Sequence, residues 1–92
     1  MSRIQRIRTA LEVALLPSLL EVSDDSHLHV GHAGAQDGRG HFSVLIVSEA
    51  FVGMPSLARH RAVYAALGDM MTTDIHALSI EARSLDEGAG QG

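Results

Sequence analysis

The chain of 92 residues contains neither cysteine nor lysine. The absence of cysteine excludes a disulfide scaffold, a zinc ribbon, a thiol nucleophile and any iron–sulfur cluster that the chain ligates alone through thiolates. No apolar run approaches the roughly 20 residues that a membrane-spanning helix needs. The first residues also lack the basic-then-apolar order of a signal peptide, so we expect a cytoplasmic protein.

The charge balance of the chain is acidic. Seven arginines stand against eleven aspartates and glutamates, and the formal net charge is −4. Domains that bind phosphate backbones are usually basic, so this balance does not favour nucleic acid, although a local arginine patch is compatible with it. Six histidines are the unusual ingredient in so short a chain.

The length and the hydrophobic content of 46% predict one small domain with a thin core. We place this domain over residues 1–84 and expect residues 85–92 to form a disordered, acidic, glycine-rich tail. Periodicity and turn residues predict a helix over 2–16, strands over 19–23, 41–48 and 75–82, a second helix over 56–71, and a long loop over 24–40. Alternatively, a short helix begins within 53–57, and a tight bend then separates two helices.

Local signals refine these elements. Ser2 and Gln5 have the spacing of a capping box, and Ser56 is the expected N-cap of the second helix. Pro17 ends the first helix. The apolar stripes predicted to face the core are Ile4, Ile7, Leu11, Ala14 and Leu15 on the first helix and Leu57, Tyr64, Leu67 and Met71 on the second.

The strand over 41–48 is apolar on both faces, because Phe42, Val44 and Ile46 alternate with Leu45 and Val47. This pattern is typical of a central strand. A right-handed helical crossover would make the second and third strands parallel, and the first two strands can form a long hairpin. The expected fold is therefore α+β, with a mixed three-stranded sheet and helices on one face.

The histidines are the main candidates for chemistry, because the sequence has no recognisable catalytic motif. His27, His29 and His32 fall in the long loop, where a solvated polar role is the simplest interpretation. His41 and His60 are expected to be structural. His76 begins the third strand, where one ring nitrogen stays accessible, although spacing alone does not make it a ligand.

Two kinds of metal site are compatible with these histidines. His27, His29, His32 and His41 are candidate zinc ligands, but they lack a strict zinc spacing. Histidine also replaces cysteine on one iron of some iron–sulfur clusters. Since this chain has no thiolate, a partner would have to supply the remaining ligands of a cluster.

Several runs of residues resemble the BolA-like family. They are Phe51-Val52-Gly53, the segment from Leu57 through Arg59-His60-Arg61 to Tyr64, Leu67, and Ile75-His76-Ala77-Leu78, preceded in order by Leu20-Glu21-Val22, Asp24-Asp25-Ser26 and His41-Phe42-Ser43-Val44. The resemblance covers roughly residues 3–83. It implies a fold similar to the class II KH arrangement, in agreement with the layout expected above.

The resemblance also implies a function. Family members are partners of monothiol glutaredoxins and hold a bridging 2Fe-2S cluster with them, in iron–sulfur maturation or iron regulation. The glutaredoxin cysteine and glutathione would supply the thiolates. In this chain the strand ligand maps onto His76, and the loop ligand maps onto His32, with His29 as the alternative because two ways of counting disagree.

A second implied role is DNA-binding transcriptional regulation through the helix-turn-helix-like segment 51–67. Arg59 and Arg61 are then the candidate phosphate contacts, although the negative net charge weakens this interpretation. A third reading is a metal-free complex with the glutaredoxin. In every case we expect a chain without enzymatic activity that is a monomer or weak homodimer when isolated.

Overall fold

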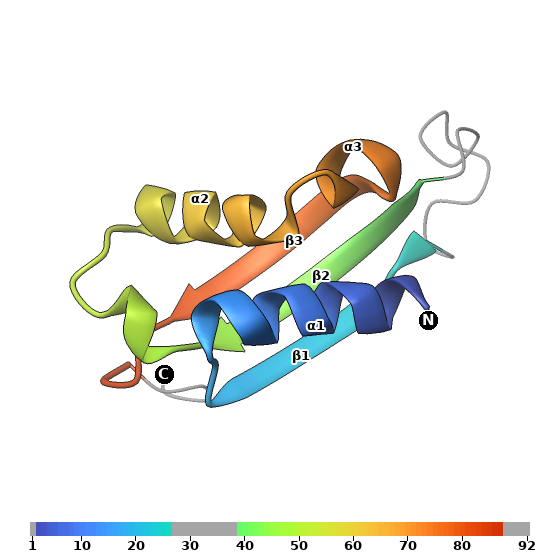
Figure 1. The fold of residues 1–92 in the computed structure, drawn as a ribbon. Helices are drawn as coiled ribbons and strands as arrows, with labels where there is room; N and C mark the ends of the chain where they lie inside the picture. Colours follow the sequence, from blue (N-terminus) through green and yellow to red (C-terminus); the bar gives the residue numbers. More distant parts are fainter. Residues whose placement is uncertain (1, 27–38, 88–92) are drawn as a thin grey trace.

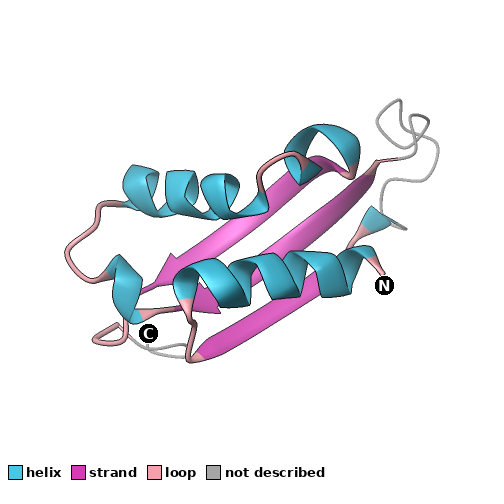
Figure 2. Ribbon diagram, viewed as in Figure 1, coloured by secondary structure: helices cyan, strands magenta, loops and turns pink. Residues whose placement is uncertain are grey.

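The computed structural model describes residues 2–26 and 39–87 (Figure 1). The elements in chain order are α1 (Arg3–Leu15), β1 (Leu19–Asp24), β2 (Gly40–Val47), the short 3-10 helix η3 (Glu49–Phe51), α2 (Ser56–Leu67), α3 (Met70–Thr73) and β3 (Ile75–Arg83). Figure 2 shows the same view by type of element. Among the described residues, no helix is both long and apolar enough to cross a membrane.

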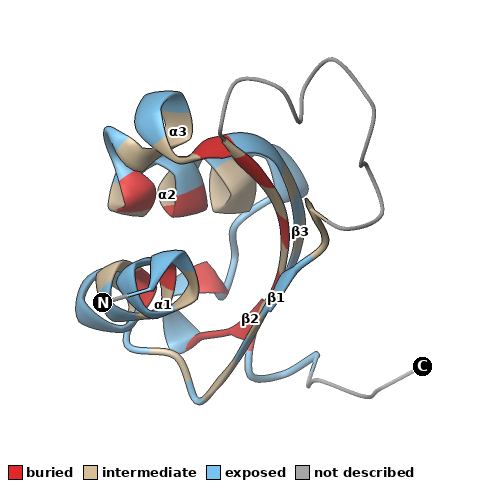
Figure 3. Cartoon of the chain, turned by 90° about the vertical axis from the view of Figure 1, so that its right-hand side faces the viewer, coloured by how far each residue is buried: buried red, intermediate tan, exposed pale blue. Residues whose placement is uncertain are grey.

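The sheet has the order β1-β2-β3, so β2 is central, as its two-sided apolar pattern predicted. β1 pairs with β2 antiparallel, and β2 pairs with β3 parallel. The helices lie on one side of the curved sheet and leave the other side uncovered (Figure 3). The expected α+β fold with a mixed sheet is therefore confirmed.

The core lies between the helices and the covered face of the sheet. Its buried residues are Ile7, Leu11, Phe42, Val44, Ile46, Phe51, Val63, Leu67 and Ile75. The alternation in β2 is as predicted, because Phe42, Val44 and Ile46 are buried while the residues between them are half-buried on the open side. α1 begins as predicted, with the Ser2 hydroxyl accepting from the Gln5 N–H, and Ala14 is an exposed exception to its predicted stripe.

The second helix differs from the prediction in its length, its cap and its buried face. A helix break at Gly68, which has a φ of 56°, divides the predicted 56–71 helix into α2 and α3. Ser56 is the first helical residue rather than the cap, and Pro55 in the cap position makes no side-chain hydrogen bond. Leu57 and Tyr64 are 61% and 41% exposed, because Val63 and Leu67 are the side chains that α2 buries.

The chain end also differs from the expected 85–92 tail. Residues 85–87 form a turn, in which the Glu87 N–H donates to the Ser84 carbonyl at 3.1 Å. The Glu87 side chain then reaches α2, as described below. Residues 88–92, and residues 27–38 of the predicted long loop, lie outside the described residues.

Candidate functional site

β3 carries one residue more than β2 at the point where these two strands begin. Gly40 pairs with Ile75, but the next residue, His41, pairs with Ala77, so His76 is the extra residue. Ile75 is fully buried, whereas His76 is exposed. An irregularity of this kind re-aims a side chain and is common beside functional sites. By strict alternation His76 would share the half-buried face of Leu78 and Ile80, and the irregularity explains why it is exposed instead.

Contacts with α1 hold this end of the sheet. The Gly40 N–H donates to the Asp74 carbonyl at 2.9 Å, and the Arg6 guanidinium donates to the Asp74 carboxylate at 2.8 Å. The hydrogen bond from Arg6 is the main reason why the pKa of Asp74 lies below its usual value. The carboxylate therefore stays charged, and it ties α1 to the residue two positions before His76.

The first residue of β2 has no room for a side chain. A Cβ on Gly40 would lie 2.7 Å from Cε2 of Phe42 and 2.9 Å from Oγ of Ser26. The same Ser26 hydroxyl accepts from the His41 N–H at 3.0 Å. Glycine thus lets the Phe42 ring and Ser26, two residues after β1, pack against the start of β2.

The structure brings His41 and His76 together. Their ring centroids are 5.1 Å apart, with an angle of 45° between the rings. Nε2 of His41 is buried, while His76 is exposed at the rim of the sheet. His76 is therefore the imidazole that an external group reaches, and imidazole nitrogen is a good ligand for iron, zinc and copper.

Arg39, the residue before β2, contacts the same imidazole. Its Nη2 lies 3.2 Å from Nδ1 of His76. A guanidinium only donates hydrogen bonds, so Nδ1 accepts this one, and in a neutral ring the proton is then on Nε2. This contact occupies one of the two nitrogens through which His76 could bind a metal.

The predicted loop ligands His32 and His29 lie outside the described residues, as does His27 of the alternative zinc set. The choice between His32 and His29 therefore stays a prediction. Within residues 2–26 and 39–87, no three His, Asp or Glu side chains gather as a metal site. The described part of the chain thus offers one accessible imidazole rather than a complete coordination sphere.

Arg59, predicted as a nucleic-acid contact, is engaged within the fold. Its guanidinium donates to the carbonyls of Met54 and Ala82 at 2.9 and 3.1 Å and to both carboxylate oxygens of Glu87 at 2.6 and 3.1 Å. Only 12% of its side chain is exposed. The hydrogen bond to Glu87 raises the pKa of Arg59, and it is the main cause that lowers the pKa of Glu87 to about 2.

The other candidates on α2 have different surroundings. Arg61 is exposed, so its guanidinium is accessible to a phosphate group, and its predicted role as a phosphate contact stays a prediction. His60 is half-buried, and its expected structural role stays a prediction. Of the two predicted arginines, only Arg61 presents its side chain openly to solvent.

Sequence reasoning missed Arg39 and the proximity of His41 to His76. His41 is expected from the sequence to be structural or a zinc ligand, and Arg39 falls within the predicted loop. The signal that places them is the register of β2 on β3, which sets His41 opposite the residue after His76. Register between strands that are distant in the chain is not encoded in local periodicity.

A family profile described as "BolA-like protein" matches residues 11–87. Among curated proteins, the chain is 46% identical to SufE-like protein 1 of Arabidopsis thaliana over 90% of its own length, and 42% identical to the chloroplastic protein BOLA1 of the same plant over 94%. It is 37% identical over 94% of its length to the DNA-binding transcriptional regulator BolA of Escherichia coli. None of these names states an enzymatic reaction.

The chain spans only part of some of these relatives. It covers 24% of SufE-like protein 1, 56% of BOLA1 and 79% of the Escherichia coli regulator. Among solved structures, the BolA domain of SufE1 from Arabidopsis thaliana has a TM-score of 0.84 at 44% identity, covering 96% of this chain and 98% of that one. BolA1 from the same plant has a TM-score of 0.83 at 39% identity, covering 97% and 98%.

Proposed function

Because the chain belongs to the BolA-like family, we propose that it is a non-enzymatic partner of a monothiol glutaredoxin and shares a bridging 2Fe-2S cluster with it. The observation that carries the proposal is the exposed imidazole of His76 at a strand irregularity. Asp74, two residues before it, is anchored by hydrogen bonds from Gly40 and Arg6. An accessible imidazole on an anchored strand end, in a chain without cysteine, fits one half of a mixed ligand set.

In this proposal His76 binds one iron, and His32 is its second protein ligand, with His29 as the alternative. Thiolates from the glutaredoxin and from glutathione bind the other iron, because soft sulfur ligands suit iron–sulfur clusters. The cluster supplies iron and sulfide for maturation, trafficking or iron sensing. Since imidazole protonates near neutral pH, such a cluster is more acid-labile than one held by thiolates alone.

The test is anaerobic reconstitution of the chain with a monothiol glutaredoxin, glutathione, iron and sulfide, followed by visible circular dichroism. We expect a spectrum distinct from that of the glutaredoxin homodimer, and we expect His76→Ala to abolish it. His60→Ala is the matched control, because it removes a histidine from α2 and should leave the spectrum intact. An unchanged spectrum in His76→Ala contradicts the assignment.

The loop ligand is assigned in the same experiment. His32→Ala should remove or strongly alter the spectrum, while His29→Ala should leave it nearly unchanged. The opposite result would exchange the two assignments. A complex that forms with no new spectrum, and with equal affinity in His76→Ala, would support a metal-free partnership instead.

DNA-binding regulation is the second candidate function, since one relative carries that name. The structure gives it little support at Arg59, whose guanidinium is bound to Glu87 and to two carbonyls. Arg61 is the arginine of the pair that it leaves exposed. This role predicts duplex binding that weakens with salt and in Arg61→Ala; the absence of any duplex affinity at low salt would exclude it.

A further inference from the structure

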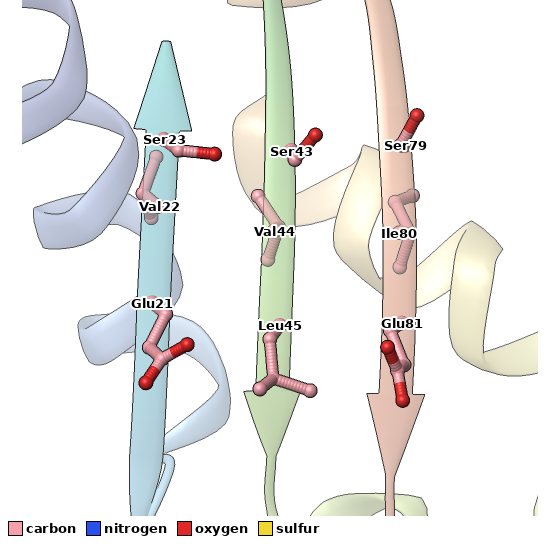
Figure 4. Close-up of a pocket in the computed structure, with 9 residues that line it drawn as sticks. All are labelled: Glu21, Val22, Ser23, Ser43, Val44, Leu45, Ser79, Ile80 and Glu81. Atoms are coloured by element: carbon pink, nitrogen blue, oxygen red, sulfur yellow. The ribbon is translucent and has the colours of Figure 1, made fainter. Parts of the chain in front are cut away.

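The uncovered face of the sheet has a shallow depression of about 520 Å³ beside the histidine pair. Figure 4 shows the side chains along its three strands. We propose that this open face is the docking surface for a protein partner that presents a basic side chain beside an apolar one. The inference rests on the proposed function, because the partner is the protein that completes the cluster at His76.

The depression is built from two rows that cross all three strands. Paired positions place Ser23, Ser43 and Ser79 in one row and Glu21, Leu45 and Glu81 in the next. The first row is a strip of hydroxyl groups. The second row sets an apolar side chain on the central strand between carboxylates on the two outer strands, as Figure 4 shows.

Asp25, the residue after β1, binds two hydroxyls of the serine row. The hydroxyls of Ser43 and Ser23 both donate to the carboxylate of Asp25. These bonds orient two of the three hydroxyls of the row, and Ser79 is the hydroxyl at its other end. A preorganised polar row lowers the side-chain ordering that a partner must impose on binding.

The open face lies next to His76, the candidate metal ligand. Ser43 follows His41 by two residues in β2, which is about 7 Å along a strand. Ser79 follows His76 by three residues in β3, and the rings of His41 and His76 are 5.1 Å apart. A protein that brings a thiolate to the exposed ring of His76 therefore has the open face immediately beside its contact point.

The carboxylates on the open face indicate which kind of molecule binds there. Glu21 makes no ion pair within the part of the chain that the structure describes, and Glu81 is paired with Arg83 of its own strand. A second copy stacked face to face would bring carboxylates toward carboxylates. Phosphate polymers and anionic membranes would be repelled for the same reason. A partner that places arginine or lysine opposite Glu21, beside an apolar side chain that packs on Leu45, complements this surface.

The experiment measures binding of a monothiol glutaredoxin by isothermal titration calorimetry and the shared cluster by visible circular dichroism. Glu21→Lys reverses the unpaired charge, and Leu45→Gln removes the apolar centre. We expect each to weaken binding by about tenfold, and added salt to reduce the difference between wild type and Glu21→Lys. Glu12→Lys is the control, since it makes the same charge change on α1, and its affinity should stay within about twofold of wild type.

The two readouts separate the docking surface from the cluster. Excess partner should restore the cluster spectrum in Glu21→Lys, whose metal ligands are intact, but not in His76→Ala. Wild-type affinity in both Glu21→Lys and Leu45→Gln, together with a normal shared spectrum, would overturn the docking surface and leave the proposed function standing.

Two further outcomes are equally decisive. Binding that is weakened by Glu21→Lys but gives no shared spectrum would support the docking surface and contradict the cluster. A wild-type chain that shows neither binding nor a new spectrum would overturn both. Thermal unfolding of each variant serves as the folding control. We expect near wild-type melting temperatures, because both substitutions lie on the uncovered face of the sheet.

Discussion

Nη2 of Arg39 lies 3.2 Å from Nδ1 of His76, and this contact is incompatible with metal ligation by His76. If Nδ1 binds iron, its lone pair is no longer available to the guanidinium. If Nε2 binds iron, Nδ1 carries the proton of the neutral ring and faces a group that only donates. Arg39 therefore has to move away whichever nitrogen is the ligand.

Arg39→Ala should consequently strengthen cluster retention in the proposed complex. Removing one competing hydrogen bond is worth about 0.5–1.5 kcal/mol, which corresponds to a roughly two- to tenfold slower loss of the cluster. The decay of the visible spectrum in the presence of a chelator measures this rate. Arg61→Ala is the control for lost positive charge. Faster loss in Arg39→Ala would mean that Arg39 helps to hold the cluster.

Gly40→Ala should damage both the fold and the site. The added methyl would lie 2.7 Å from the Phe42 ring, so we expect a loss of about 1–3 kcal/mol in the free energy of unfolding. Urea denaturation measures this loss. The cost of Gly40→Ala should be smaller in a Phe42→Leu background, which removes the clashing ring atoms, and equal costs in the two backgrounds would contradict the packing argument.

Glu87→Gln should reduce stability in a pH-dependent way. The folded pKa of Glu87 is about 2, below the ordinary value of 4.5, mainly because Arg59 donates to its carboxylate. A lowered folded pKa gives stabilisation that is fully present above pH 4.5 and is lost as the pH falls toward 2. The melting temperature of Glu87→Gln should therefore lie below that of wild type at pH 7 and approach it at pH 3.

Glu12→Gln serves as the comparison for this prediction. Glu12 makes only an exposed pair with Arg8 at 3.5 Å on one helix, and such pairs contribute little. We expect its melting curve to follow that of wild type at both pH values. A Glu87→Gln difference that is the same at pH 7 and pH 3 would show that the carboxylate charge is not what stabilises this turn.

The fold could be predicted from the sequence wherever local pattern and tertiary packing agree. β2 alternates cleanly between Phe42, Val44 and Ile46 on one face and half-buried residues on the other, so its central place followed directly. α2 is a different case, because apolar residues lie all round it. Burial of Val63 rather than Tyr64 depends on how the helix is rotated on the sheet, which periodicity alone does not determine.

The sequence indicated the candidate site only in part. The family resemblance predicts His76 as a ligand, which stays a prediction, and the structure adds that His76 is the extra residue of an irregular strand pair. The partners His41 and Arg39 could not be found, because their proximity to His76 depends on register between distant strands. The sequence suggested Arg59 as a nucleic-acid contact because its ion pair with Glu87, 28 positions away, cannot be seen in a local pattern.

Pulsed electron paramagnetic resonance of the reduced cluster measures whether a nitrogen of His76 binds iron. The chain, labelled with ¹⁵N-histidine, is reconstituted with an unlabelled monothiol glutaredoxin and glutathione. We predict strong ¹⁵N couplings from directly bound imidazole in the wild type and in His60→Ala, and no shared cluster in His76→Ala. A shared cluster that shows no ¹⁵N coupling, or the same couplings in His76→Ala, would contradict ligation by His76.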